Sequence, residues 1–240
     1  MENYIDLVQR SRRIIASWLG NVGNTNSNSN SNSIQEMYDS LISINDWKAA
    51  IQSPLTCNNV NQCLDIMNKV TLKDLGLHSI NLERINRSFC MHIIQNDMFH
   101  MSIFIIPKQC KLPLHDHPNM SVLSKVIKGN LKMRSFNINK DYQTKAGKKL
   151  FPATITNNNI KTNSDNSWCL SPSIDNIHDF EASGETVVVL DVLMPPYNDD
   201  DGRPCNFYEE LVDNGNQFLS VGPEPDLPSS VAYKGIIPKI

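Results

Sequence analysis

The sequence predicts a mainly β chain with a helical N-terminal preface, and three observations support this fold class. From Phe89 onward, short runs rich in β-branched and aromatic residues alternate with turn signals, which is typical of a β-sandwich or barrel. Between residues 34 and 76, apolar residues repeat at helical spacing instead. Residues 112–136 read as strand, corner, strand, tight turn and strand.

Length and composition narrow the class of protein further. A chain of 240 residues is expected to form one domain, or one domain with appendages, and is long enough to bury a full core. The net charge of −3 and the lack of a basic patch argue against nucleic acid or an anionic membrane as a partner. The six cysteines form no C-x-x-C pair and no regular framework, so we expect reduced thiols. We therefore predict a monomer in the cytoplasm, with the nucleus also open.

The first part of the chain is predicted to be an appendage. Within the N-terminal segment 1–23, residues 3–19 are predicted to form an amphipathic helix with arginines, which could be a mitochondrial presequence. Glu2 and Asp6 count against that reading, since such peptides are poor in acids, and a helix docked on the domain is favoured. Residues 24–33 contain only Asn, Ser and Thr, so we predict a disordered linker.

The remaining chain divides into a helical preface over 34–80, packed on the core, and a β domain over 81–240. Gly76 is predicted to end the helical region, and the Asn-rich run 157–166 is predicted to be a loop. The candidate strands are 89–95, 98–106, 112–117, 120–127, 131–137, 151–156, 167–171, 186–194, 205–212 and 217–221.

The run Leu112 to Pro118 contains the most informative pair of residues. His115 and His117 are two residues apart, so on a strand their side chains point to the same face, while Asp116 points to the other. Two imidazoles on one face can supply two ligands to a metal and leave room for a third. An H-x-H alone is a weak signal, but His178 lies downstream, where a strand of a two-sheet roll can return beside the first.

The other histidines are expected to play smaller parts. His78, just past the helical preface, is predicted to lie on the surface. His92 and His100 are expected to be satisfied core or rim histidines. His100 is the reserve metal ligand, because its strand directly precedes the H-x-H strand.

Taken together, these features resemble the cupin superfamily and, more narrowly, the cysteamine (2-aminoethanethiol) dioxygenase and plant cysteine oxidase family of cupin thiol dioxygenases. The likeness covers most of the chain outside the Asn/Ser tract. The residues that carry it are Pro113–Pro118, Val122–Lys125, the turn at Gly129, Asn176–His178, Leu190–Leu193, Pro195–Tyr197, Gly202–Cys205, Pro223–Asp226 and Tyr233–Gly235.

The resemblance implies a cupin-type double-stranded β-helix, or jelly roll, that holds Fe(2+) on His115, His117 and His178. It implies an oxidoreductase that uses O2 to oxidise cysteamine, the N-terminal cysteine of proteins, or both, to a sulfinic acid. With a protein substrate it also implies oxygen sensing through protein turnover. The physical chemistry agrees, since three neutral imidazoles leave the +2 charge uncompensated and favour a soft anionic ligand such as a thiolate.

Three more residues gain roles from the resemblance. Asp191 matches an acid near the iron that could hold the substrate amine or order a water, and an acid in mid-strand is costly unless it has a partner. Tyr197 could donate a hydrogen bond to oxygen or substrate, or could simply pack after the Pro-Pro corner. Cys205 could line the pocket, or could be a small buried hydrophobe.

The sequence also departs from the family pattern. Val122 lies roughly where general cupins have a glutamate, as in the thiol dioxygenases. Asp175 stands where the family usually has glycine, which puts the local turn in doubt. Phe207 occupies the position at which some animal relatives have the tyrosine of a Cys–Tyr thioether, although Tyr208 is adjacent.

Two other classes of function stay open at this point. A zinc hydrolase or lyase could use the same three imidazoles, with Asp191 as the single candidate base. A cupin that binds a ligand or partner without turnover is the other alternative.

Overall fold

The computed structural model describes residues 33–139, 141–225, 229–233 and 235. The predicted N-terminal helix and all of the predicted linker except Ser33 lie outside the described residues. The described chain is mainly β, as the sequence predicts. No helix in these ranges has the length and apolar character needed to cross a bilayer.

The helical elements lie before the first long strand. They are α2 (Ser33–Ile42), α3 (Trp47–Gln52), η2 (Pro54–Thr56), α4 (Asn58–Met67) and η3 (Leu82–Arg84), with a later turn η4 (Asp199–Asp201). The strands are β1 (Phe89–Gln95), β2 (His100–Ile106), β3 (Lys111–His115), β4 (Ser121–Lys128), β5 (Asn130–Ile138), β6 (Gln143–Lys145), β7 (Lys148–Thr162), β8 (Trp168–Leu170), β9 (Ile177–Ala182), β10 (Val187–Met194), β11 (Tyr208–Asp213), β12 (Asn216–Val221) and β13 (Ser229–Ala232).

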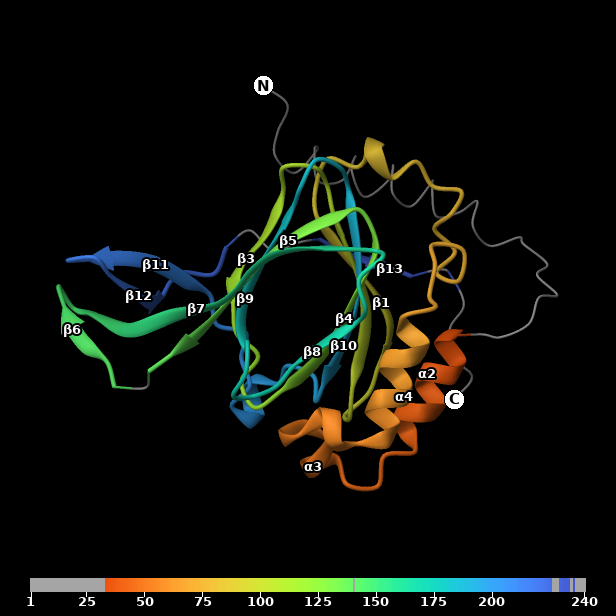
Figure 1. The fold of residues 1–240 in the computed structure, drawn as a ribbon, viewed down its shortest axis with the longest axis horizontal. Helices are drawn as coiled ribbons and strands as arrows, with labels where there is room; N and C mark the ends of the chain where they lie inside the picture. Colours follow the sequence, from red (N-terminus) through yellow and green to blue (C-terminus); the bar gives the residue numbers. More distant parts are fainter. Residues whose placement is uncertain (1–32, 140, 226–228, 234, 236–240) are drawn as a thin grey trace.

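Two curled sheets face each other in the body of the molecule (Figure 1). One sheet has the strand order β13-β1-β2-β10-β4-β8, and the other has the order β11-β12-β7-β5-β9-β3 with β6 paired to β7. In each sheet a late strand inserts between early ones, because β10 lies between β2 and β4 and β9 lies between β5 and β3. This interleaving produces the roll and places strands distant in sequence beside one another.

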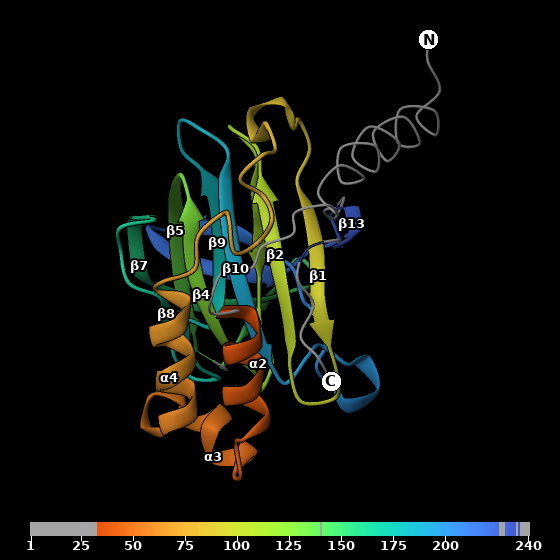
Figure 2. The same ribbon diagram turned by 90° about the vertical axis from the view of Figure 1, so that its right-hand side faces the viewer.

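The helices cover the outer face of the sheet that contains β1, β2 and β10 (Figure 2). Met37 and Leu41 of α2 share one buried cluster with Met101, Ile103 and Leu190 of the sheet. Because side chains alternate along a strand, the residues between them face the other sheet. The helical preface therefore buries one face of the sheet and leaves the other for the interior of the roll.

The α-helical region ends earlier than the sequence predicts. The last α-helix stops at Met67, and residues 68–88 consist of turns and η3 rather than helix up to Gly76. Asp74 explains part of this, since its carboxylate accepts from both the backbone N–H and the hydroxyl of Thr71, at 2.8 and 2.6 Å. Such local side-chain bonds compete with helix formation.

Most strands lie where the sequence predicts them, but the loop predicted for residues 157–166 is wrong for residues 157–162 and confirmed only for 163–166. β7 continues to Thr162, and its Asn-rich half pairs with β5 from Asn157↔Ser135 to Thr162↔Asn130. Backbone hydrogen bonds alone specify this pairing, so polar side chains that stay exposed are tolerated there. The apolar pattern that reveals a half-buried strand is missing from such a segment.

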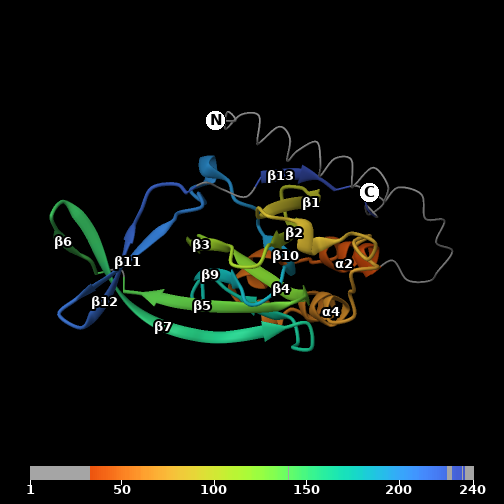
Figure 3. The same ribbon diagram turned by 90° about the horizontal axis from the view of Figure 1, so that it is seen from above.

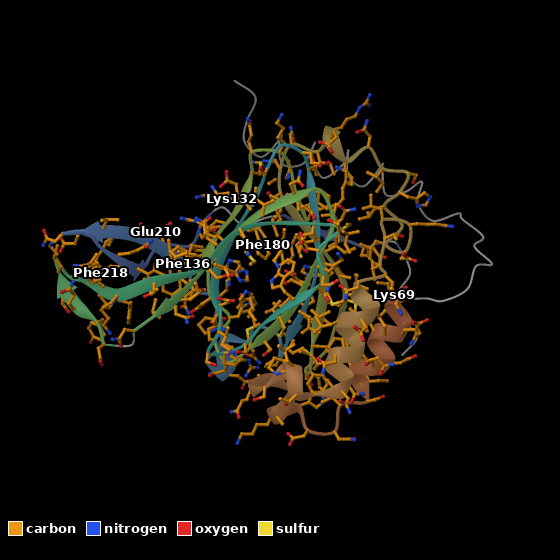
Figure 4. The ribbon with its side chains drawn as sticks, in the orientation of Figure 1. Lys69, Lys132, Phe136, Phe180, Glu210 and Phe218 are labelled. Carbon is orange, nitrogen blue, oxygen red and sulfur yellow. The ribbon has the colours of Figure 1, made fainter. Side chains whose placement is uncertain are left out.

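A β arm projects from the body, formed by β6, β11, β12 and the start of β7 (Figures 1 and 3). Arg134 of β5 ties this arm to the roll, because it forms ion pairs with both Asp179 of β9 and Glu210 of β11. Figure 4 shows Glu210 and Phe218 on the arm, and Phe180 between the two sheets of the body.

The tight turn predicted at Gly129 joins β4 to β5. Its φ of +87° is accessible to glycine, and an added Cβ would lie 2.7 Å from the carbonyl oxygen of Thr186. The glycine therefore lets the β4–β5 corner approach the start of β10.

We expect the α2 contact with the sheet to contribute strongly to stability. Leu41 is fully buried, so Leu41→Ala removes packed methyl groups and should lower the free energy of unfolding by ~2–5 kcal/mol. Urea denaturation followed by circular dichroism measures the change. Glu36→Ala, on the exposed side of the same helix, should change stability by no more than ~0.5 kcal/mol. Equal effects of the two substitutions would contradict this packing.

Candidate metal centre

Strand pairing brings the predicted ligands together. β3 and β9 are antiparallel neighbours, and His115 lies directly opposite His178 in their register. The register shifts between Leu112 and His115, and β3 ends at His115, two residues before His117. The strand predicted to reach residue 117 is therefore shorter, yet both histidines still turn toward the same interior space.

The three imidazoles form a compact cluster. Their nearest ring nitrogens all lie within 4.8 Å of one another. The ring centroid of His115 is 4.9 Å from that of His117 and 4.8 Å from that of His178, and the remaining pair is 4.9 Å apart. The Nε2 atoms of His117 and His178 are 3.4 Å apart.

Hydrogen bonds outside the cluster orient each ring. His115 donates from Nδ1 to the carbonyl of Pro113 at 2.8 Å. His117 places Nδ1 2.8 Å from the hydroxyl of Tyr197, which itself donates to the backbone carbonyl of Asp116 at 2.7 Å. Since the tyrosine hydrogen is used on the carbonyl, Nδ1 of His117 is the donor in their contact. The Nε2 lone pairs of His115 and His117 are left facing the cluster.

The cluster is electrostatically suited to a cation. Burial lowers the pKa of His115, and burial together with the neighbouring rings holds the pKa of both His117 and His178 well below the ordinary value. All three rings are therefore neutral at pH 7 and present lone pairs to one another with no hydrogen to share. Three neutral nitrogen donors that converge in this way fit a first-row divalent metal.

Asp175 shows how the departure from the family's glycine is accommodated. Its φ is +56°, the left-handed region that glycine adopts freely and aspartate tolerates. Its carboxylate accepts from the Thr156 hydroxyl at 2.5 Å and the Asn157 amide at 2.6 Å. Its backbone in turn accepts a hydrogen bond from His178. The turn conformation is thus preserved, and its backbone helps to orient His178.

Asn176 forms hydrogen bonds with both the backbone N–H and the backbone carbonyl of His117. Its side-chain oxygen accepts from the His117 N–H at 3.1 Å, and its amide nitrogen donates to the His117 carbonyl at 2.8 Å. The residue two positions before one ligand therefore fixes the main chain of another.

Asp116 forms hydrogen bonds with the segment that contains Asn206 and Tyr208. Its carboxylate accepts from the backbone and side chain of Asn206, at 2.9 and 3.0 Å, and from the Tyr208 hydroxyl at 2.8 Å. These bonds confirm that Asp116 points away from the metal ligands. Phe207, which lies between these two partners in the chain, forms a bridge to His115.

A cavity of about 290 Å³ opens beside the cluster, between the two sheets. The three histidines, Tyr197 and Cys205 line one side. Asp191, Ser102, His100, His92 and Cys90 line the other.

Asp191 is the charged group that the sequence places in an apolar strand. It is buried on β10, with Ser102 directly opposite on β2 and Ser124 directly opposite on β4. Burial raises the pKa of Asp191 to about 7, opposed by the Ser124 hydroxyl. Its Oδ1 and both serine hydroxyls have no hydrogen-bond partner of good geometry among the described residues. These orphaned polar atoms indicate a ligand with hydrogen-bond donors or positive charge.

Tyr197 and Cys205 both lie at the site, but their contacts differ from the simplest expectation. The Tyr197 ring stacks on His117, with centroids 5.4 Å apart. Its hydroxyl forms hydrogen bonds with His117 Nδ1 and with the backbone carbonyl of Asp116. Its direct contact is therefore with a metal ligand. Burial raises the pKa of Cys205 to about 11, so its thiol is neutral.

Sequence reasoning missed the two serines beside Asp191, because only the strand register shows that they face it. It also did not place His92 and His100 in the cavity wall, although both line it. The signal that could have assigned them to the interior face is alternation, because His92 lies between the buried Met91 and Ile93, and His100 precedes the buried Met101.

The matching family model and the curated relatives agree on one protein family. The family model described as PCO_ADO matches residues 43–226. The probable 2-aminoethanethiol dioxygenase of Dictyostelium discoideum is 35% identical over 130 residues, 53% of this chain and 58% of that protein. The 2-aminoethanethiol dioxygenase of Homo sapiens is 27% identical over 139 residues, 50% of this chain and 52% of that protein.

Plant cysteine oxidase 1 of Arabidopsis thaliana is 31% identical over 121 residues, 50% of this chain and 41% of that protein. The chain thus spans about half the length of the curated relatives it matches. Among solved structures, a cupin superfamily protein from Desulfitobacterium hafniense is 13% identical, covers 47% of this chain and 82% of its own, and has a TM-score of 0.32.

The first prediction for this site concerns the ligand at position 178. His178→Ala removes one of three converging nitrogens and should abolish stoichiometric binding of a divalent metal while leaving the β circular dichroism signal intact. Metal analysis after anaerobic loading and desalting measures it. His78→Ala, at an exposed histidine outside the cluster, is the control. Full metal content in His178→Ala would mean that His100 or another group is the ligand.

The second prediction concerns the hydroxyl that orients His117. Tyr197→Phe keeps the stacked ring but removes the acceptor for Nδ1–H, so metal affinity should fall ~10–100-fold. Titration against a competing chelator measures the dissociation constant. Tyr142→Phe, at an exposed tyrosine near the β arm, should leave the affinity unchanged. An unaltered affinity in Tyr197→Phe would show that the hydroxyl does not act through His117.

Proposed function

The chain belongs to the PCO_ADO family, and on that premise we propose that it is an iron-dependent thiol dioxygenase. Its substrates are cysteamine, the N-terminal cysteine of proteins, or both, and its product is the sulfinic acid. The observation that carries the proposal is the cluster of three neutral imidazoles beside a cavity whose opposite wall holds a buried carboxylate with one oxygen, Asp191 Oδ1, that has no hydrogen-bond partner among the described residues.

Charge balance supports both the metal and the thiol. His115, His117 and His178 would hold Fe(2+) without neutralising it, so the site favours a soft anion such as a thiolate over a neutral ligand. The chemistry that the ion supplies is the activation of dioxygen beside the thiolate.

The opposite wall selects the rest of the substrate. A thiol substrate of this class carries an amine two carbons from sulfur, and a protonated amine would supply the donors that Asp191 Oδ1 and the Ser102 hydroxyl lack. We therefore assign Asp191 the role of amine holder. Tyr197 fixes the ring of His117, and Cys205 closes the side of the cavity as a neutral thiol.

One observation favours the zinc hydrolase or lyase as the second candidate. The pKa of Asp191 is raised to about 7 by burial, which would suit a general base. The family match and the printed names of the relatives favour the dioxygenase.

The cellular setting is proposed on the same basis. The six cysteines are all free thiols, which fits a reducing compartment such as the cytoplasm, with the nucleus also open. If proteins with N-terminal cysteine are the substrate, the reaction would couple oxygen level to protein turnover. We propose that the chain acts as a monomer.

An oxygen electrode tests the proposal directly. Iron-loaded protein is offered cysteamine, free cysteine and a cysteine-initiated peptide, alongside the same peptide with serine first. We expect oxygen uptake with at least one thiol, none with the serine peptide, and none with zinc-loaded protein. Uptake that is independent of thiol, or absent with every thiol, would refute the dioxygenase.

We predict a specific defect in Asp191→Asn. The substitution keeps the shape of the side chain and removes its charge, so metal binding should be normal. For an amine-bearing thiol, kcat/KM should fall ~10–100-fold, the range for loss of a charged hydrogen bond. For a thiol without the amine the loss should be smaller. Equal losses for both substrates would mean that Asp191 acts on the oxygen or on the fold.

The same group predicts a pH dependence. With its pKa near 7, Asp191 becomes neutral as pH falls, whereas an α-amino group with a pKa of ~7.7–8.0 stays charged. Because the α-amino group itself loses its charge above pH ~8, the advantage of the wild type over Asp191→Asn should be greatest between about pH 7 and 8 and should shrink as pH falls through 7. Parallel pH–rate profiles of the two proteins measure this ratio. A constant ratio would contradict ionisation of Asp191 in this range.

A further inference from the structure

The cavity wall carries a second histidine cluster that the proposed reaction does not use. His92 Nδ1 lies 2.7 Å from His100 Nε2, and the two ring centroids are 4.7 Å apart. Both rings line the same cavity as the metal ligands. The outer nitrogens, His92 Nε2 and His100 Nδ1, have no hydrogen-bond partner in the part of the chain that the structure describes.

Proton counting defines what this histidine pair offers. Burial and the nearby His92 lower the pKa of His100 to about 4, and burial also lowers the pKa of His92. Two neutral rings carry two N–H groups, of which one lies in the bond between them. Whichever ring donates in that bond, the outer nitrogens present one donor and one acceptor.

The position of the pair relates it to the amine site. In the sheet, Asp191 lies opposite Ser102, and Ser102 lies opposite His92. His92 is therefore two strand spacings, about 10 Å, from Asp191. Along this row burial decreases, because Asp191 and Ser102 are buried and His92 is exposed. His100, which contacts His92 from the neighbouring strand, is half-buried. The row leads from the closed end of the cavity to solvent.

We propose that the His92–His100 pair binds the main chain of a polypeptide substrate just beyond its N-terminal cysteine. A peptide unit presents one N–H and one carbonyl, which complement the one acceptor and one donor of the pair. An extended chain advances ~3.3–3.6 Å per residue, so ~10 Å is reached by the second or third residue. Cysteamine ends at its amine and cannot reach the pair.

This inference rests on the proposed function and commits the site to a peptide end rather than a small thiol. It assigns His92 and His100 to substrate recognition and not to the chemistry. It also gives a reason for two polar rings on a wall that includes the apolar side chains of Phe104 and Leu193.

Kinetics on matched substrates test the pair. In His92→Phe, His100→Phe and the double variant, aromatic bulk is kept and the polar nitrogens are lost. For a cysteine-initiated tripeptide, kcat/KM should fall about five- to thirtyfold, while kcat/KM for cysteamine stays within about twofold. His92→Gln, which retains a donor and an acceptor, should recover much of the loss. His78→Phe is the control for an exposed histidine elsewhere.

A second arm probes the peptide directly. N-methylation of the tripeptide's backbone removes a hydrogen-bond donor. It should lower kcat/KM for the wild type and leave kcat/KM of the double variant unchanged, because that variant lacks the histidine nitrogen that would accept from this donor. If His100→Phe fails to fold, the exposed His92→Phe alone carries the comparison. Equal losses on tripeptide and cysteamine, or no loss on either, would overturn the inference.

Binding separates this inference from the proposed reaction. The serine-initiated tripeptide has no thiol to oxidise. Calorimetric titration therefore measures how the His92–His100 pair affects peptide affinity, whether or not the protein oxidises thiols. Weaker binding to the double variant than to wild type supports the pair even if no thiol is oxidised, in which case only the proposed reaction fails. Equal binding to both proteins refutes the pair even if the wild type oxidises thiols.

Discussion

The register between β3 and β9 is the constraint on which the site depends. It places His115 opposite His178, although the two residues are far apart in sequence. A shift of one residue would turn one ring to the opposite face of the sheet, because side chains alternate. β9 pairs with β3 on one side and with β5 on the other. Arg134 of β5 also forms an ion pair with Asp179, the residue after His178. The roll thus places the main chain of two ligands through backbone pairing.

The third ligand needs a different kind of support, since His117 lies beyond the end of its strand. Asn176 holds its main chain, and Tyr197 holds its ring. Asp116 ties the same corner to Asn206 and so to the segment after Cys205. Each of these partners is itself buried or half-buried, so the corner is rigid without regular secondary structure.

Much of this could be predicted from the sequence, and the limits have physical causes. Alternation and turn residues reveal the half-buried strands, and the H-x-H spacing with a later histidine indicates the ligand set. The Asn-rich part of β7 was hidden because an exposed strand needs no apolar pattern. The serines beside Asp191, and the facing of His92 and His100, depend on register between strands, which long-range pairing sets and no local pattern records.

In the proposed function, the three imidazoles and the buried carboxylate serve the dioxygenation of a thiol. Mass spectrometry of the product formed under isotopically labelled dioxygen tests this most directly. We expect iron-loaded protein to convert an amine-bearing thiol to a sulfinic acid in which both oxygen atoms come from the same dioxygen molecule. A disulfide as the main product, or oxygen atoms derived from water, would contradict it.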